Sequence, residues 1–378
     1  MERSASVAIN SKERIRMLLS GQIPDRVGKA DAPWPETRAR WIEEGLPKTV
    51  HASDFFKMDI RTNIKMLASF QFEEKTIEDT DEFQTVSDAD GNISKYWKGK
   101  SGVPMHLKYA IANRADWERV KPRLVANDER FAFGYYGNYF HEYTSGAFAK
   151  VKAAYDASKT KTETCVMLEM PDPYEFAMAK MGDENILMTM AMEPELLHDM
   201  FDTYVKMIID LGEIALSRGF KPDGVFVGGD IAYKNGMLMS PGMYRAVIFP
   251  YLKRMIDHFK RERGLGIIYH SDGRVTEALP ILYEAGIDCI EPLEVNAGMD
   301  VRTLIKDWGR KLAFMGNIST VTMAGPKDKL REEVMSKIEA CREARARYIV
   351  HSDHSVPDTV SFENMQLVVE LVDKFGRY

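Results

Sequence analysis

The sequence of 378 residues predicts an α/β fold, a closed barrel of eight parallel strands joined by helices. From residue 164 onward, short apolar runs alternate with segments of helical periodicity, which is the pattern of parallel strands connected by helical crossovers. The number of these runs, together with earlier strands in the aromatic region before them, favours a closed barrel over an open sheet. No low-complexity linker divides the chain, and barrels of this kind commonly reach this length. We therefore expect residues 1–378 to form a single barrel domain.

The amino-terminal third predicts additions to the barrel. Ser11 is a candidate cap for a short amphipathic helix, and residues 31–47 contain a second helix, started by a proline and closed by Gly45. Alternating polar and apolar residues between 53 and 122 predict an antiparallel hairpin excursion. The aromatic segment 134–142 precedes a basic amphipathic helix. Its sequence is equally compatible with a loop near a pocket and with the start of a surface helix.

The regular part of the chain can be divided into strands and helices. We predict strands over 166–170, 224–227, 265–269, 288–291, 312–315 and 348–350. We predict helices near 174–182, 195–217, 241–262, 274–285, 300–308, 327–345 and 361–375.

Composition excludes several classes of partner and location. The net charge of −6 is mild and spread along the chain, so we expect no nucleic acid and no anionic membrane as partner. No stretch approaches 18 apolar residues, and the amino terminus has no leader-like apolar run, so a cytoplasmic protein is expected. Cys165, Cys289 and Cys341 are far apart, as expected for buried small hydrophobic residues in a reducing compartment.

Polar and titratable residues follow the predicted strands at their carboxyl ends. Because the loops after parallel strands converge at one end of a barrel, we expect these side chains to face one another. They are Glu169, Asp172, Tyr174, Asp230, Tyr233, His270, Asp272, Arg274, Glu291, Glu294, Asn317, His351, Asp353 and His354. The alternative is that these loops are polar only because they lie at the surface.

Two of these segments carry groups that can bind a metal. His270 and Asp272 lie two residues apart after one strand, and His351, Asp353 and His354 follow another. Imidazole and carboxylate ligands with one open position are the pattern of a catalytic zinc site. A lone histidine after a strand more often makes structural hydrogen bonds, and spacing alone leaves open which of the five residues would be ligands. Without thiolate ligands, zinc is a stronger Lewis acid, suited to polarising an oxygen atom, and Glu169, Asp230 or Glu291 could supply a proton or orient a ligand.

An ordered set of motifs between about residues 30 and 375 resembles the uroporphyrinogen decarboxylase superfamily. The motifs are Gly228-Gly229-Asp230, Gly236-Met237-Leu238-Met239-Ser240-Pro241, His270-Ser271-Asp272-Gly273, Ala285-Gly286-Ile287-Asp288, Glu291-Pro292, Phe314-Met315-Gly316-Asn317-Ile318, Ser355-Val356-Pro357 and Glu363-Asn364. The resemblance implies a TIM (β/α)8 barrel with the helical and hairpin additions named above.

Within that superfamily, the resemblance implies one of two activities. Uroporphyrinogen decarboxylases carry an arginine-rich segment near the amino terminus, whereas the corresponding helix here, residues 36–44, contains three acids and lacks that motif. The other branch is similar to cobalamin-dependent methyltransferases, whose zinc is held by a His-x-Cys pair and a later Cys. His270 and Asp272 stand at the pair and His354 stands about where the later Cys would be, so these three are the implied metal ligands.

The resemblance and the missing thiolates together favour an O-demethylase-like activity. A methyl group would move from a small methylated, methoxylated substrate to a corrinoid (cobalamin) on a partner protein, with Asp230, Glu169 and Glu291 as acid or orienting residues. Aromatic residues suited to the substrate are Trp34, Tyr135, Tyr136 and Tyr233, with Asn317 and His351 as polar neighbours. One alternative is a decarboxylase of a small acid, in which Asp230 or Asp272 handles the proton and Arg38 or Arg40 binds a carboxylate. The other is a barrel that only binds a tetrapyrrole or a partner. The sequence leaves open whether the chain forms a homodimer.

Overall fold

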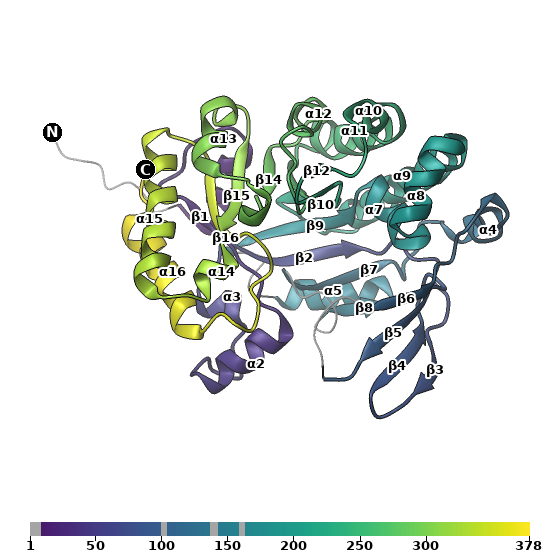
Figure 1. Cartoon of the computed structure of the whole chain (residues 1–378), viewed down its shortest axis with the longest axis horizontal. Coiled ribbons are helices and arrows are strands. Elements are labelled where there is room, and N and C mark those ends of the chain that lie inside the picture. Colours follow the sequence, from purple (N-terminus) through teal and green to yellow (C-terminus); the bar gives the residue numbers. More distant parts are fainter. Residues whose placement is uncertain (1–8, 100–103, 137–142, 159–162) are drawn as a thin grey trace.

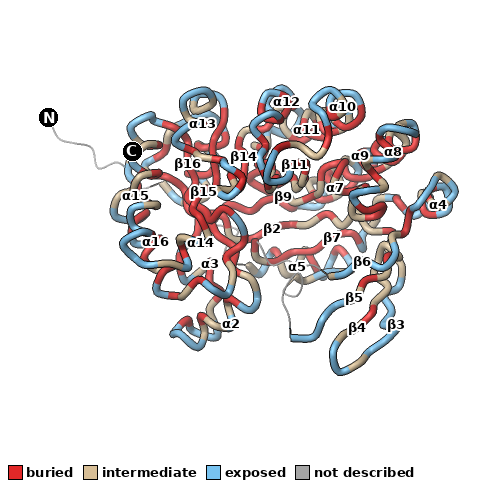
Figure 2. Tube along the Cα trace, viewed as in Figure 1, coloured by how far each residue is buried: buried red, intermediate tan, exposed pale blue. Residues whose placement is uncertain are grey.

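The computed structural model describes residues 9–99, 104–136, 143–158 and 163–378, and it confirms the predicted barrel. Eight parallel strands follow one another around it in chain order (Figure 1). They are β1 (Gly28–Lys29), β2 (Ile60–Met66), β9 (Cys165–Pro171), β10 (Gly224–Gly228), β13 (Gly266–His270), β14 (Cys289–Glu291), β15 (Ala313–Ile318) and β16 (Tyr348–Ser352). Figure 2 shows these strands buried in the interior, as expected for strands covered on both sides.

The barrel closes between its first two strands. β1 pairs with β16, and the backbone N–H of Asp59, just before β2, donates to the carbonyl of Lys29 at 2.7 Å. The fully buried Asp59 carboxylate also accepts from the Lys29 N–H at 2.9 Å, from Arg14 at 2.8 Å and from Arg26 at 3.0 Å. This seam therefore depends on side-chain contacts as well as on strand pairing.

Helices surround the barrel. They are α1 (Ser11–Leu19), α2 (Pro35–Glu43), α3 (Ala52–Phe55), α4 (Arg114–Val120), α5 (Phe148–Ala157), α7 (Pro173–Met181), α8 (Asp183–Met192), α9 (Pro194–Ser217), α10 (Pro241–Val247), α11 (Phe249–Asp257), α12 (Leu279–Ala285), α13 (Val301–Trp308), α14 (Thr320–Met323), α15 (Lys327–Glu343) and α16 (Phe362–Phe375). α1 covers the end of the barrel where the strands begin, because Leu18 and Leu19 pack against Gly28, Gly224 and Gly266. A Cβ at Gly266 would lie 2.6 Å from the Cβ of Leu19, so only glycine allows this approach.

The hairpin excursion is also confirmed. β3 (Lys75–Asp79), β4 (Phe83–Ser87), β5 (Ile93–Trp97) and β6 (Met105–Lys108) form a separate antiparallel sheet that stands beside the barrel (Figure 1). β7 (Phe131–Tyr135) pairs with β2 in antiparallel fashion, and β8 (Thr144–Gly146) pairs with β7. β11 (Ala232–Tyr233) and β12 (Gly236–Met237) form a small hairpin after β10.

Several local expectations need correction. Asn10, not Ser11, caps α1, since its side chain accepts from the N–H of Glu13. The helix expected over 241–262 is divided at Ile248 between α10 and α11, and Pro250, which has no N–H, stands in the first turn of α11. Its last residues, His258–Glu262, form a π-helical turn. Among the described residues, no helix combines the length and the apolar character needed to span a bilayer.

A candidate metal site at the barrel mouth

The carboxyl ends of β10, β13 and β14 bring four predicted residues together. Strand register places His270, at the end of β13, opposite Gly228 on one side and Glu291 on the other. Asp230 follows β10 by two residues, and Asp272 follows β13 by two residues. The expectation that the strand-end residues face one another is therefore confirmed for this group.

The imidazole of His270 lies between carboxylates. Its Nδ1 contacts Oε2 of the buried Glu291 in a short hydrogen bond, and its Nε2 lies 3.4 Å from Oδ1 of Asp230. The backbone N–H of Asp272 donates to the same Asp230 oxygen at 2.9 Å. A histidine whose Nδ1 contacts a carboxylate presents its Nε2 in a fixed direction, which is the usual arrangement of a metal-binding histidine.

Glycines allow the two loops to approach. A Cβ at Gly229 would lie 2.5 Å from the carboxyl group of Asp172 and from the hydroxyl of Tyr269. Gly273 has a φ of +82°, and a Cβ there would lie 2.7 Å from the backbone of Ala232 and Tyr233. The glycines of the Gly-Gly-Asp and Ser-Asp-Gly sequences have no side chain to block these close contacts. This allows the adjacent Asp230 and Asp272 to take their positions.

The donor set fits a divalent metal ion. Asp230, His270 and Asp272 each offer one ligand atom, and these atoms lie within 4.8 Å of one another. Ligands of a tetrahedral zinc ion are about 3.3 Å apart, given bonds of about 2 Å, so small side-chain adjustments would suffice. In addition, Oδ1 of Asp272 is buried and has no hydrogen-bond partner among the described residues. A buried acceptor without a donor is unfavourable unless a cation satisfies it.

His354, the third ligand that the resemblance implies, lies next to this group through Asp272. It is exposed, and its Nε2 lies 3.5 Å from Oδ2 of Asp272. The described metal-capable group includes Asp230, which we had expected to be an acid or orienting residue, and it does not include His354. Asp230 belongs to the group because it follows β10, the strand directly next to β13, a neighbour relation that sequence spacing does not reveal.

Burial and neighbouring charges set the protonation of the cluster. Burial lowers the pKa of His270, but the carboxylates of Glu291 and Asp230 outweigh it and raise that pKa well above its usual value. Burial raises the pKa of Asp230 and Glu291, yet contact with His270 brings both below their usual values. Burial raises the pKa of Asp272 to about 6, opposed by His270. Without metal, the cluster therefore holds an imidazolium between carboxylates, and a divalent cation would take the place of that proton.

A cavity of about 380 Å³ opens beside this cluster. Its apolar wall includes Met66, Met170, Tyr136 and Phe226, and its polar wall contains Lys65, Glu169, Glu175, Asp230 and His270. Glu169, predicted as an acid or orienting residue, does line this cavity. It is bound to Lys65 at 3.0 Å and accepts a hydrogen bond from Asn63.

The structure distinguishes among the predicted aromatic residues. Tyr136 lines the cavity, with its ring 5.6 Å from that of Phe226, whereas Tyr135 stacks on His51 at 3.7 Å and donates to Asp54. Successive residues of an extended strand point to opposite sides, which explains the difference. Trp34 stands at the start of α2, and the half-exposed Tyr233 lies on the β11–β12 hairpin, so neither lines the cavity. Of the predicted aromatic loop, residues 137–142 lie outside the described residues.

Asn317 and His351 are buried and hold the loops together. Asn317 accepts from the N–H of Val301 and donates to the carbonyls of Leu293 and Met299, each at 2.7 Å, so its amide is occupied by the backbone. His351 lies 3.8 Å from both Asp31 and Glu291, and its Nε2 is 3.5 Å from the hydroxyl of Tyr136. His351 therefore connects the cavity wall to the carboxylate that holds His270.

Two acids, the fully buried Asp172 and the partly buried Glu175, extend the site beyond the predicted residues. Asp172 caps α7 by accepting from the N–H of Glu175 at 2.7 Å, and its other oxygen accepts from Tyr269 at 2.6 Å. Burial raises the pKa of both Asp172 and Glu175 to about 7, with Asp230 adding to the shift. We expected Asp172 at a strand end, but not Glu175, which lines the cavity from the first turn of α7. Asp172 and Glu175 are three residues apart, the spacing of a capping box at the start of a helix. This spacing is the feature of the sequence that could have indicated Glu175.

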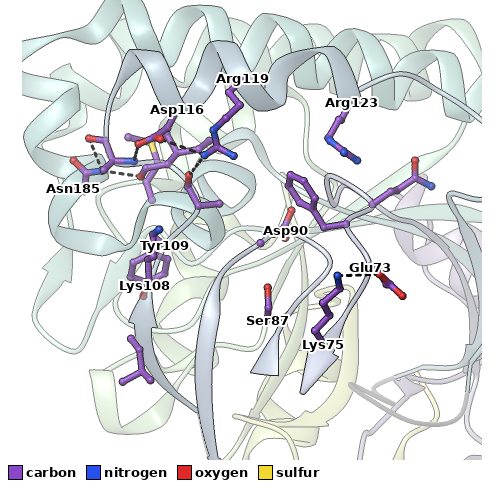
Figure 3. A pocket seen from close by; sticks show the side chains of 18 residues that line it. Glu73, Lys75, Ser87, Asp90, Lys108, Tyr109, Asp116, Arg119, Arg123 and Asn185 are labelled. Atoms are coloured by element: carbon purple, nitrogen blue, oxygen red, sulfur yellow. Dashed lines mark hydrogen bonds and ion pairs between the residues drawn. The ribbon is translucent and has the colours of Figure 1, made fainter. Parts of the chain in front are cut away.

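A second cleft of about 970 Å³ lies between the β3–β6 sheet and the region of α4 and α8 (Figure 3). Two of its four cations are paired with acids of the same cleft, since Lys75 contacts Glu73 at 3.2 Å and Arg119 contacts Asp116 at 3.2 Å. None of the four strand-end residues around His270 lines it. We therefore place the candidate active site at the barrel mouth.

A closed parallel barrel with an imidazole and carboxylate cluster at its mouth defines a class, the α/β-barrel proteins with a candidate metal site. The chain belongs to the uroporphyrinogen decarboxylase (URO-D) family, whose model matches residues 153–375, more than half of the sequence. The resemblance to that superfamily is thus confirmed.

Relatives and solved structures extend this assignment. Uroporphyrinogen decarboxylase from Xanthomonas euvesicatoria is 22% identical over 223 residues, which cover 57% of this chain and 58% of the relative. The enzyme of the same name from Pelobacter propionicus is 25% identical over 142 residues, covering 38% of this chain and 40% of the relative. The matches thus span 58% of the first and 40% of the second of these curated relatives. A methyltransferase from Methanosarcina mazei superimposes with a TM-score of 0.64 at 15% identity, covering 97% of this chain and 99% of the other, which supports the barrel fold.

Proposed function

We propose that this chain is a zinc-dependent methyltransferase that moves a methyl group from a small methoxylated substrate to a corrinoid on a partner protein. The observation that carries the proposal is the mouth itself, a cavity of about 380 Å³ with apolar walls beside a sulfur-free cluster of Asp230, His270 and Asp272. That volume suits a molecule of small-drug size. The name of the Methanosarcina mazei fold neighbour is consistent with methyl transfer.

The chain's own residues would bind and orient the substrate. Phe226 and Tyr136 supply an aromatic wall on which a planar ring can pack. Asp230, His270 and Asp272 would hold zinc, while Glu291 fixes the orientation of His270. Bound zinc supplies a Lewis acid that stabilises the negative charge left on the substrate oxygen when its bond to the methyl carbon breaks. Glu175, whose pKa of about 7 leaves it protonated in part near neutrality, can deliver a proton to that oxygen.

The decarboxylase alternative meets a poorly matched site. A tetrapyrrole with eight carboxylates would face Glu169, Glu175 and Asp230, with Lys65 as the one Lys or Arg in the described lining, already bound to Glu169. Arg40, which we considered as a carboxylate-binding residue, pairs with Glu44 at 2.6 Å on α2. Repulsion between the substrate carboxylates and the acids of the cavity would oppose binding of such a substrate.

Methyl transfer to free cobalamin tests the proposal. Zinc-loaded protein, chemically reduced cob(I)alamin and a panel of aryl methyl ethers should give methylcobalamin, detected by its absorbance, together with the free phenol. Uroporphyrinogen is the comparison substrate, with carbon dioxide release as the readout. Phenol and methylcobalamin in equal amounts support the proposal. Carbon dioxide release without methyl transfer would replace it with the decarboxylase.

A further inference from the structure

The end of the barrel opposite the mouth carries a groove of about 990 Å³. The end of α1 borders it, together with residues just before β10, β13, β15 and β16. Its charged lining residues are Arg16, Lys221, Lys260, Arg263, Arg310, Lys311 and Arg347, against Asp223 and Asp288. The chain as a whole has a net charge of −6, so this groove reverses the overall sign.

Both acids of the groove are already neutralised. The fully buried Asp223 carboxylate is bound by Lys12 at 3.0 Å, by Arg16 and by the N–H of Val166. Asp288 is bound by Lys260 at 2.7 Å and by the N–H of Ile267 at 2.9 Å. Neither carboxylate is therefore available to balance further positive charge.

Four cations remain without a carboxylate. Within the part of the chain that the structure describes, Lys221, Arg310, Lys311 and Arg347 form no ion pair with an acid; Arg263, in contrast, is bound to Glu213. Arg347 is only 5% exposed, and to the described residues its guanidinium donates one hydrogen bond, from Nη1 to the carbonyl of Leu18 at 3.1 Å. A buried guanidinium has five N–H donors, so most of its hydrogen-bonding capacity remains for a ligand in the groove.

The cleft of Figure 3 is the internal comparison. It has a similar volume, about 970 Å³, but its four cations, Lys75, Lys108, Arg119 and Arg123, face three acids, Glu73, Asp90 and Asp116, and Lys75 and Arg119 are bound to two of them. Cations gathered without counter-charge repel one another and create a local positive potential that attracts anions. The difference between the two hollows therefore lies in charge balance and not in size.

We propose that the groove at the amino-terminal end of the barrel binds a multiply charged phosphate anion, a di- or triphosphate. Arginine guanidinium groups match phosphate oxygens in a two-point geometry, and four cations suit a ligand with several negative charges. The exposed Tyr283 also lines the groove, and the nearby Trp308 ring lies 5.9 Å from it and 4.6 Å from the Lys311 ammonium. A nucleotide base could stack on Tyr283 while its phosphates contact Arg310, Lys311 and Arg347. Inorganic polyphosphate would use the cations alone.

Calorimetric titration with inorganic triphosphate and with ATP tests this site in near-physiological salt. The test variant is Arg310→Ser/Lys311→Ser, which removes two unpaired cations from the groove. The matched control is Lys306→Ser/Arg331→Ser, which removes the same charge from exposed positions of α13 and α15 that do not line the groove. Citrate serves as a polyanion without phosphate.

We expect triphosphate to bind the unmodified protein below millimolar concentration and to bind the test variant at least about tenfold more weakly, since the variant loses charge-assisted hydrogen bonds to phosphate. The control variant should bind as the unmodified protein does. Tighter binding of ATP, reduced in Tyr283→Ala, assigns the site to a nucleotide, and equal binding assigns it to free polyphosphate. Absence of triphosphate binding, an equal loss in the control, or equal binding of citrate would overturn the proposal.

Discussion

Nε2 of His270 lies 3.4 Å from Oδ1 of Asp230, while Nδ1 of the same ring contacts Glu291. One imidazole is thus directed by a buried carboxylate toward a second carboxylate at the edge of the cavity. This pair is the centre of the candidate site, because Asp272 contacts Asp230 through its backbone and His354 approaches Asp272 from the rim.

The first prediction concerns the metal ligands. His270→Ala should lower zinc affinity at least about a hundredfold, since removing a ligand costs more than removing the group that orients it. Glu169→Gln is the control, because Glu169 lies across the cavity, bound to Lys65 and Asn63, outside the described metal-capable group. Zinc content after dialysis, measured by mass spectrometry, should fall in the first variant and persist in the second. Equal zinc in both would remove His270 from the ligand set.

The second prediction separates metal binding from Lewis acidity. Asp272→Cys should keep zinc, because thiolate is a good zinc ligand, but should slow cleavage of a methyl ether by about tenfold or more, because thiolate donates more charge to the ion. The rate of phenol release with cob(I)alamin and the zinc content should be measured on the same preparation. Unchanged turnover with full zinc occupancy would argue against the Lewis-acid account.

The third prediction concerns stability and pH. Burial raises the pKa of Asp172 to about 7, so the folded protein keeps this proton in a range where the unfolded chain has released it. The contribution of Asp172 to the free energy of unfolding is therefore fully present below about pH 4. This contribution, on the order of a few kcal/mol, is lost as the pH rises toward 7. Asp172→Asn should flatten this decline in urea unfolding measured between pH 4.5 and 7.5.

The control for that experiment is Asp307→Asn, at an exposed position of α13. Its stability should follow that of the unmodified protein at every pH. Parallel curves for Asp172→Asn would show that Asp172 is ionised in the folded protein. Glu175 has the same upward shift and remains in the variant, so part of the pH dependence should persist.

The fourth prediction isolates a close backbone approach under the mouth. Gly316 has a φ of +117°, and a Cβ there would lie 1.8 Å from the carbonyl oxygen of Pro292. Gly298 also has a positive φ, +81°, but nothing lies within 4 Å of its Cβ position. Gly298→Ala should cost about 1 kcal/mol of unfolding free energy, and Gly316→Ala should cost at least about 3 kcal/mol. Similar midpoints in chemical denaturation would contradict this steric explanation.

The sequence predicted those features of the fold that depend on the residues of a single strand or helix. Short apolar runs such as 224–227 and 348–350 located the strands to within one or two residues, because buried parallel strands are apolar on both faces. Residues placed at strand ends, including His270 and Glu291, do meet at the mouth. The family was recognisable from motifs whose glycines have a structural role, as at Gly229 and Gly273.

The rest depended on contacts between elements. Asp230 joins the metal-capable group because β10 and β13 are neighbours, and His354 lies at the rim because its loop extends beyond β16. Tyr136 and not Tyr135 lines the cavity because of strand direction, which an aromatic pair in sequence does not reveal. Asn317, with a φ of +69°, turned out to bind backbone groups, a use that becomes apparent only once the loops around it are placed.

The carboxylate of Asp59 gives the amino-terminal helix a part in making the ring continuous. This one residue binds the short first strand, α1 through Arg14 and the following loop through Arg26. If α1 detaches, the buried Asp59 carboxylate loses the Arg14 guanidinium and retains Arg26 and the Lys29 N–H, which weakens the joint between β1 and β2. The amino-terminal helix therefore contributes to the circular shape on which the mouth depends, although it supplies no residue to the described lining of the mouth itself.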